Sequence, residues 1–178
     1  MVKIMAMSSE ELTVLDCTFR DGGYYNDWDF DDSLVGRYLR DVGSSGVDVI
    51  EIGFRYLPKD RFLGAFAYST DSYLNTLNLP SNKKIGVMVD AKELFSYADG
   101  VAAAIKLLFQ SSAHSPVSVV RVAVHFKDIA HAQEITKLLK ILGYEVGLNL
   151  MQAAGKPLEE LTEKAAVVTS WGSVDVLY

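Results

Sequence analysis

Apolar and amphipathic segments alternate along the chain. Runs dominated by Val, Ile, Leu and Met end in polar residues, and most precede a segment whose apolar residues recur every three or four positions. The first pattern predicts buried strands and the second predicts helices that cover them. Strands are expected at 12–15, 47–54, 83–90, 117–126, 144–152 and 173–178. Helices are expected from Asp31 or Asp32 to Gly43 or Gly46, and at 71–79, 92–110 (interrupted near 99–100), 129–142 and 157–168, with a long loop at 55–70.

This order of elements predicts a parallel sheet with helices on its faces. The two faces of the predicted strand at 117–126 differ in polarity. Arg121 and His125 share one face, and only apolar residues occupy the other. That division favours a barrel lumen over a doubly wound sheet, and no glycine-rich nucleotide-binding loop begins a helix. We predict an α/β fold of (β/α)8 TIM-barrel type, of which residues 12–178 supply about the first five and a half units. Residues 1–11 are expected to form an N-terminal tail.

The expected barrel is incomplete in this chain. A full barrel needs eight units and about 250 residues, whereas the sequence has 178. The sixth predicted strand is followed by no helix. We therefore expect either a fragment of a longer polypeptide or a chain that needs a partner, and whether the natural chain continues past Tyr178 stays open.

Composition narrows the class of protein. The chain is 49% hydrophobic with a formal net charge of −6, which is globular composition and argues against nucleic acid as a partner. Cys17 is the only cysteine, so no intrachain disulfide can form and a reducing compartment is expected. No apolar run is long enough for a transmembrane helix, and the N-terminus does not resemble a signal peptide. We expect a cytoplasmic protein without a membrane partner, and a homo-oligomer is left open.

Polar side chains gather where the predicted strands end. They are Asp16, Thr18, Arg20, Asp21, Glu51, Asp90, Arg121, His125, Asn149 and Gln152. In a barrel these ends converge on one cavity, where active sites of this architecture lie. Arginines with carboxylate and amide oxygens predict a site for an anionic substrate and a hard cation such as Mg²⁺ or Mn²⁺. Any single member could instead be a hydrogen-bonded lumen residue, and Arg20 beside Asp21 could be an ordinary ion pair.

Strand alternation divides the first motif. Asp16, Thr18 and Arg20 would face the lumen, whereas Cys17 would face the helices and pack there. The loop Tyr24-Tyr-Asn-Asp-Trp28 would form either a pocket wall or a surface staple.

Two motifs carry a specific resemblance. Asp16-Cys-Thr-Phe-Arg-Asp-Gly-Gly23 and Val49-Ile-Glu-Ile-Gly53 resemble the DRE-TIM metallolyase superfamily, whose pattern is D-x-T-x-R-D-G on strand one and a glutamate on strand two. The stretches 121–125 and 143–151 are similar to its 4-hydroxy-2-oxovalerate aldolase branch. The resemblance runs from Leu12 onward, and the aromatic loop after Gly23, where the synthases have Glu-Gln, also favours this branch.

The resemblance implies roles for the residues that match it. Asp21 would bind a divalent metal, Mn²⁺ or Mg²⁺, with no nucleotide cofactor; Arg20 would stabilise an enolate oxygen, and Glu51 would hold Arg20 by a bidentate pair. Substrate contacts are expected from Asp16, Thr18, Asp90, Arg121, His125 and Asn149. The family's remaining metal ligands form a His-x-His pair on strand seven, and none of the three histidines, His114, His125 and His131, forms such a pair.

The activity implied is that of a metal-dependent carbon–carbon lyase of aldolase type, acting on a 2-oxo acid enolate and an aldehyde, with a 2-oxo acid or its aldol as the small-molecule partner. Two alternatives stay open. One is a Claisen-type synthase or lyase that uses an acyl-CoA. The other is a non-catalytic half-barrel fragment or interaction module.

Overall fold

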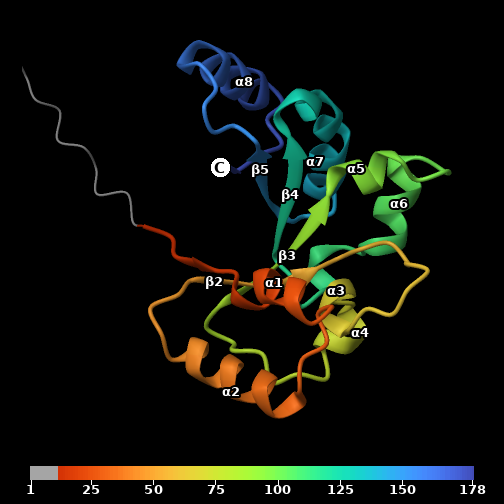
Figure 1. Ribbon diagram of the computed structural model, residues 1–178, viewed down its shortest axis with the longest axis vertical. Coiled ribbons are helices and arrows are strands. Elements are labelled where there is room, and N and C mark those ends of the chain that lie inside the picture. Colours follow the sequence, from red (N-terminus) through yellow and green to blue (C-terminus); the bar gives the residue numbers. More distant parts are fainter. Residues whose placement is uncertain (1–11) are drawn as a thin grey trace, which may run out of the picture.

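One parallel sheet of six strands organises the molecule, in the order β1-β2-β3-β4-β5-β6 (Figure 1). The computed structural model describes residues 12–178, and the tail predicted over 1–11 lies outside the described residues. The strands are β1 Leu15–Asp16, β2 Val49–Phe54, β3 Lys84–Asp90, β4 Val119–His125, β5 Glu145–Met151 and β6 Val176–Leu177. Because each strand pairs with its neighbours in sequence, the sheet curls like part of a barrel wall.

Helices connect the strands and cover the outer face of the sheet. They are α1 Thr18–Gly22, α2 Asp32–Gly43, α3 Ala65–Tyr68, α4 Asp71–Leu74, α5 Ala91–Phe95, α6 Val101–Leu108, α7 Ala132–Ile141 and α8 Leu158–Ser170, with short 3-10 turns at Gly23–Tyr25, Ser112–His114 and Phe126–His131. This alternation with an all-parallel sheet is a partial (β/α)8 TIM barrel, and the predicted fold class is confirmed.

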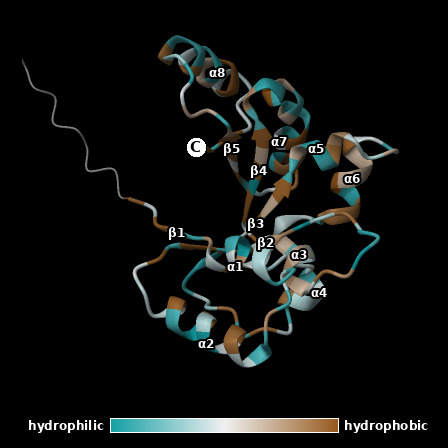
Figure 2. Cartoon of the chain, in the orientation of Figure 1, coloured by the Kyte–Doolittle hydropathy of each residue, from teal (hydrophilic) through white to brown (hydrophobic). Residues whose placement is uncertain are grey.

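The core lies between the sheet and the helices. Val120, Val122 and Val124 of β4 are at most 2% exposed, and α5 and α7 pack against this strand. Figure 2 shows the result, with hydrophobic strands and helices that carry both kinds of residue. The opposite face of β4 carries Arg121 and His125, so the predicted division of this strand between core and lumen is confirmed.

The first motif folds differently from the prediction. Its strand is only Leu15–Asp16, and α1 begins at Thr18, with the amide of Asp21 bonded to the carbonyl of Cys17 at 2.9 Å. The cause is Phe19, whose ring stacks on Phe30 at 4.3 Å and on Tyr38 of α2 at 4.0 Å. Burying this ring between α1 and α2 turns the backbone out of the extended conformation.

Other segments also differ in detail, and the helix expected at 71–79 is only α4, Asp71–Leu74. The segment expected as a long loop at 55–70 contains α3. The helix expected at 92–110 divides into α5 and α6 around residues 99–100, where an interruption was expected, and Gly100 adopts a φ of 85° there. Within residues 12–178, no helix has the length and apolar character that crossing a membrane requires.

Candidate functional site

A buried carboxylate between two arginines is the centre of the candidate site. Glu51 of β2 accepts a hydrogen bond from Nε of Arg20 at 2.7 Å. Its two oxygens also accept from Nη1 of Arg121 on β4, at 3.0 and 3.1 Å. The side chains of Glu51, Arg20 and Arg121 are 1%, 13% and 10% exposed. The resemblance implied a bidentate pair between Glu51 and Arg20, whereas the structure shows one bond from Arg20 and a second arginine on the same carboxylate.

The carboxylates of this cluster stabilise the positive charge of Arg20. Burial opposes the positive charge of Arg20, but the hydrogen bond to Glu51 and the charges of Glu51 and Asp21 raise its pKa above the ordinary value. Arg20 also pairs through Nη1 with Oδ1 of Asp21. Two cations and two carboxylates therefore lie close together, and Arg20 remains cationic at any physiological pH.

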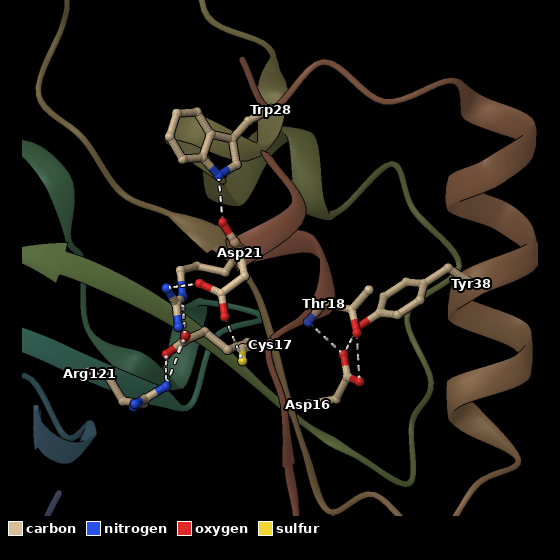
Figure 3. Close-up of polar contacts among 9 residues, drawn as sticks. Asp16, Cys17, Thr18, Asp21, Trp28, Tyr38 and Arg121 are labelled. Carbon is tan, nitrogen blue, oxygen red and sulfur yellow. Dashed lines mark hydrogen bonds and ion pairs between the residues drawn. The ribbon is translucent and has the colours of Figure 1, made fainter. Parts of the chain in front are cut away.

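Asp21 is the exposed member of the cluster, and Cys17 lies beside it. The Asp21 side chain is 55% exposed, and its Oδ2 accepts from Sγ of Cys17 at 3.3 Å, as Figure 3 shows. Burial and this contact with Asp21 raise the pKa of the Cys17 thiol. The predicted orientation of Cys17, facing the helices, is wrong, because its thiol points toward Asp21 of the arginine cluster.

The described residues do not form a complete metal site. Among residues 12–178 there is no group of three or more His, Cys, Asp or Glu side chains placed to hold a metal ion. Asp21 is the single carboxylate of the cluster that reaches solvent, and both of its oxygens already have partners in Arg20 and Cys17. The residues present thus supply at most one ligand of the divalent-metal site that the resemblance implies.

Asp16 and Thr18 lie away from this cluster. Asp16 accepts from the amide and the hydroxyl of Thr18, each at 3.0 Å, and from the hydroxyl of Tyr38 on α2. Burial and the bond to Asp16 raise the pKa of Tyr38, so its hydroxyl stays a donor. Figure 3 shows these three residues as a group separate from Asp21 and Arg121. The predicted lumen orientation of Asp16 and Thr18 is wrong, and a substrate contact by either stays a prediction that this geometry does not favour.

The other predicted substrate contacts lie at or near the carboxyl-terminal ends of β3, β4 and β5, which form one edge of the sheet. Asp90, at the end of β3, is in register with Ala123 of β4, which is in register with Asn149 of β5, and His125 follows at the end of β4. Asp90 caps α5 by accepting from the amide of Lys92 at 2.8 Å. His125 Nδ1 is buried without a partner among the described residues, as is Nε of Arg121. Substrate binding by Asp90, Arg121, His125 and Asn149 stays a prediction, and all four lie at or near this edge.

Tyr178 is a member of the site that sequence reasoning missed. Its ring lies over the guanidinium of Arg121, with 4.5 Å between Cζ and the ring centroid. Gly147 makes the room, since a Cβ at that position would lie 3.0 Å from Cγ of Arg121 and 3.2 Å from Cε2 of Tyr178. The contact depends on the register of β4, β5 and β6, which a single sequence does not reveal.

The aromatic loop after Gly23 is a wall of the site. Trp28 is 3% exposed, and its Nε1 donates to the backbone carbonyl of Arg20 at 2.9 Å. A Cβ at position 23 would lie only 1.9 Å from the Trp28 ring, so the glycine is required for this contact. Of the two readings left open by the sequence, the structure favours the pocket wall for Tyr24 and Trp28, whereas Tyr25 is 95% exposed.

Comparison with known proteins points to one kind of enzyme. No protein-family model matches the chain. It is 27% identical over 169 residues to a 4-hydroxy-2-oxovalerate aldolase of Pelotomaculum thermopropionicum, covering 94% of this chain and 47% of the relative. It is 28% identical over 174 residues to 4-hydroxy-2-oxovalerate aldolase 4 of Rhodococcus opacus, with 96% and 47% coverage. The chain therefore spans about half the length of the curated relatives it matches.

A solved structure agrees with these relatives. The crystal structure of the N-terminal domain of a candidate aldolase from Bacteroides vulgatus matches with a TM-score of 0.73 and 30% identity, covering 93% of this chain and 53% of that one. The predicted resemblance to the aldolase branch is thereby confirmed. Neither the acyl-CoA enzyme nor the non-catalytic module is favoured by these relatives.

Proposed function

We propose that this chain carries the enolate-stabilising part of an aldolase that joins or cleaves a 2-oxo acid enolate and an aldehyde. The observation that supports it is the contact of half-buried Arg20 and buried Arg121 with Glu51, in a partial barrel related to aldolases. A 2-oxo acid carries negative charge on its carboxylate and develops more on its oxo group when it loses a C3 proton. Two fixed cations near one another suit such a ligand, because they need no reorganisation as the second charge forms.

The two arginines have different parts in this proposal. Arg20 is held by Glu51 through Nε and by Asp21 through Nη1, so its guanidinium plane is fixed, and it would stabilise the enolate oxygen. Arg121 uses only Nη1 on Glu51 and lies under Tyr178, and it would bind the carboxylate. Glu51 would touch neither part of the substrate and would position both cations.

The cofactor of the proposal is a divalent metal, Mn²⁺ or Mg²⁺, which would polarise the 2-oxo acid as a Lewis acid. Asp21 is the ligand that this chain would contribute, by virtue of its exposed carboxylate. A 2-oxo acid or its aldol is the proposed small-molecule partner, and a homo-oligomer is compatible with this proposal.

Proton exchange tests the proposal without an aldehyde. The protein at its full natural length is incubated with pyruvate and Mg²⁺ in D₂O, and loss of the methyl proton signal is followed by NMR. We expect the wild-type protein to exchange the methyl protons well above the buffer rate. Arg20→Lys should lower this rate about 100-fold or more, because a lysine ammonium cannot donate to both Glu51 and the enolate oxygen as the planar guanidinium does. Arg40→Lys, at a 70% exposed position on α2, is the matched control.

Two results would contradict the proposed function. One is wild-type exchange no faster than buffer with either Mg²⁺ or Mn²⁺. The other is an Arg20→Lys rate equal to that of the Arg40→Lys control.

A further inference from the structure

An open cavity of about 420 Å³ lies beside the arginine cluster and has no part in the enolate chemistry. Its wall includes the rings of Tyr24, Trp28 and Tyr56 and the charged side chains of Lys59, Asp90 and Glu93. These residues come from the aromatic loop, from the segment after β2 and from the end of β3 with the start of α5. The cavity therefore opens at the carboxyl ends of the strands, where substrates of this architecture bind.

Aromatic rings connect the wall of the cavity to Arg20. Phe54 stacks on Tyr56 with 4.5 Å between ring centroids and meets Trp28 edge-on at 5.4 Å. The guanidinium carbon of Arg20 lies 5.8 Å from the centroid of the same Phe54 ring. Tyr24 completes the wall, edge-on to Trp28 at 4.8 Å. A ligand in the cavity would thus lie next to the group proposed to stabilise the enolate.

Carboxylates outnumber cations around the cavity, because its lining contains Asp90 in addition to two ion pairs. Lys59 pairs with Glu93, and the neighbouring Arg61 pairs with Asp27 at 2.6 Å. Burial raises the pKa of Tyr56, so this phenol stays a neutral hydroxyl. The cavity offers aromatic faces, a hydroxyl and charged groups whose oxygens and nitrogens can still hydrogen-bond. Its surplus of carboxylates over cations disfavours an anionic ligand.

We propose that this cavity is the acceptor subsite and that it takes an uncharged, polyhydroxylated aldehyde. The proposal rests on the proposed function, because an aldol reaction needs a second carbonyl partner. In the joining direction C3 of the 2-oxo acid loses a proton and forms a bond to the aldehyde carbon, and the aldehyde oxygen takes up a proton to become a hydroxyl. Cleavage is the reverse, and neither direction needs an oxidant or a reductant.

The lining selects this class over the two obvious rivals. A two-carbon aldehyde would leave most of the 420 Å³ to water. An aromatic aldehyde would pack on Tyr24 and Trp28, but it would remove water from Asp90 and Glu93 without returning hydrogen bonds, which is costly. A hydroxylated chain places its C–H faces on the rings and its hydroxyls on the carboxylates, so that both kinds of surface are satisfied.

Saturation-transfer NMR tests the subsite without turnover. The probes are D-erythrose, acetaldehyde and benzaldehyde at equal concentration, against the wild-type protein, Tyr24→Ala, Tyr56→Phe and Tyr25→Ala. Tyr25 is the matched control, since it is 95% exposed and outside the cavity, whereas Tyr24 is 61% exposed and lines it. We expect transfer to D-erythrose that falls about fivefold or more in Tyr24→Ala, through loss of the ring face. Tyr56→Phe should weaken it by a smaller factor, and Tyr25→Ala should leave it unchanged.

The outcomes separate this inference from the proposed function. Equal transfer in Tyr24→Ala and wild type, or stronger transfer to acetaldehyde or benzaldehyde than to D-erythrose, overturns the subsite. If D-erythrose binds in a Tyr24-dependent way while pyruvate exchange is absent, the acceptor role fails together with the proposed function. If exchange occurs and D-erythrose does not bind, the proposed function stands and the subsite is overturned.

Discussion

Neutralising Glu51 should lower the free energy of unfolding more than removing any exposed ion pair does. Glu51→Gln keeps the size of the side chain and replaces one carboxylate oxygen by an NH₂ group. In the wild type Oε1 and Oε2 lie 3.0 and 3.1 Å from Nη1 of Arg121, and Oε1 also lies 2.7 Å from Nε of Arg20. The NH₂ group of the glutamine would face an N–H group of one of the arginines, so that two hydrogen-bond donors would meet. Both guanidinium groups would also lose their negatively charged partner.

The expected loss is large for a domain of this size. Removing one partner of a buried ion pair costs about 3–5 kcal/mol, whereas the whole free energy of unfolding of such domains is about 5–15 kcal/mol. Urea unfolding followed by tryptophan fluorescence should show the midpoint lowered by about 1.5–2.5 M for a slope of about 2 kcal/mol/M. Glu145→Gln is the control, because the Lys84–Glu145 pair is 55% and 36% exposed, and it should cost less than about 1 kcal/mol.

A second variant checks the cause. Glu51→Gln combined with Arg121→Met removes one of the two unpaired cations and should recover part of the loss, leaving Arg20 with Asp21. A Glu51→Gln loss no greater than that of Glu145→Gln would refute the reasoning, and so would a double variant less stable than Glu51→Gln alone.

Three further variants test packing and pH dependence by the same urea assay. Gly147→Ala should lose about 1–3 kcal/mol, because its new methyl group would press on Arg121; a neutral result would contradict the crowding. Gly36→Ala, on the exposed face of α2 with nothing within 4 Å, should instead gain about 0.5–1 kcal/mol. Burial opposes ionisation of Asp175, but hydrogen bonds from the amide of Val146 and from Lys140 lower its pKa below the ordinary value. The stability that the Asp175 carboxylate contributes is therefore present above the unfolded pKa of about 3.9 and lost as the pH falls through the folded pKa. The wild type should be more stable than Asp175→Asn near neutral pH, and the two should become equally stable in acid.

The barrel wall could be predicted from the sequence because its signals are local. The face of β4 with Val120, Val122 and Val124 repeats every second residue, and the same strand carries Arg121 and His125 on the other face. Short-range alternation of this kind decides which side of a parallel sheet meets the helices.

The first motif could not be predicted in the same way because a distant contact shapes it. The stacking of Phe19 on Tyr38, nineteen positions later by number, turns the chain into α1 and reverses the orientation expected for Cys17 and Asp16. Alternation holds only while the backbone is extended. The link between Glu51 and Arg121 likewise joins residues on strands that are not neighbours in the sheet, and so no local pattern signals it.

The shared carboxylate of Glu51 also has a consequence for how such sequences can vary over evolution. A change at position 20 or 121 alters the counter-ion balance of the other arginine, and a change at position 51 affects both at once. Substitutions at these three positions should therefore show strong epistasis, each harmful alone and tolerated only in combination. Lineages that depart from this arrangement are expected to have exchanged all three residues as a single inherited unit.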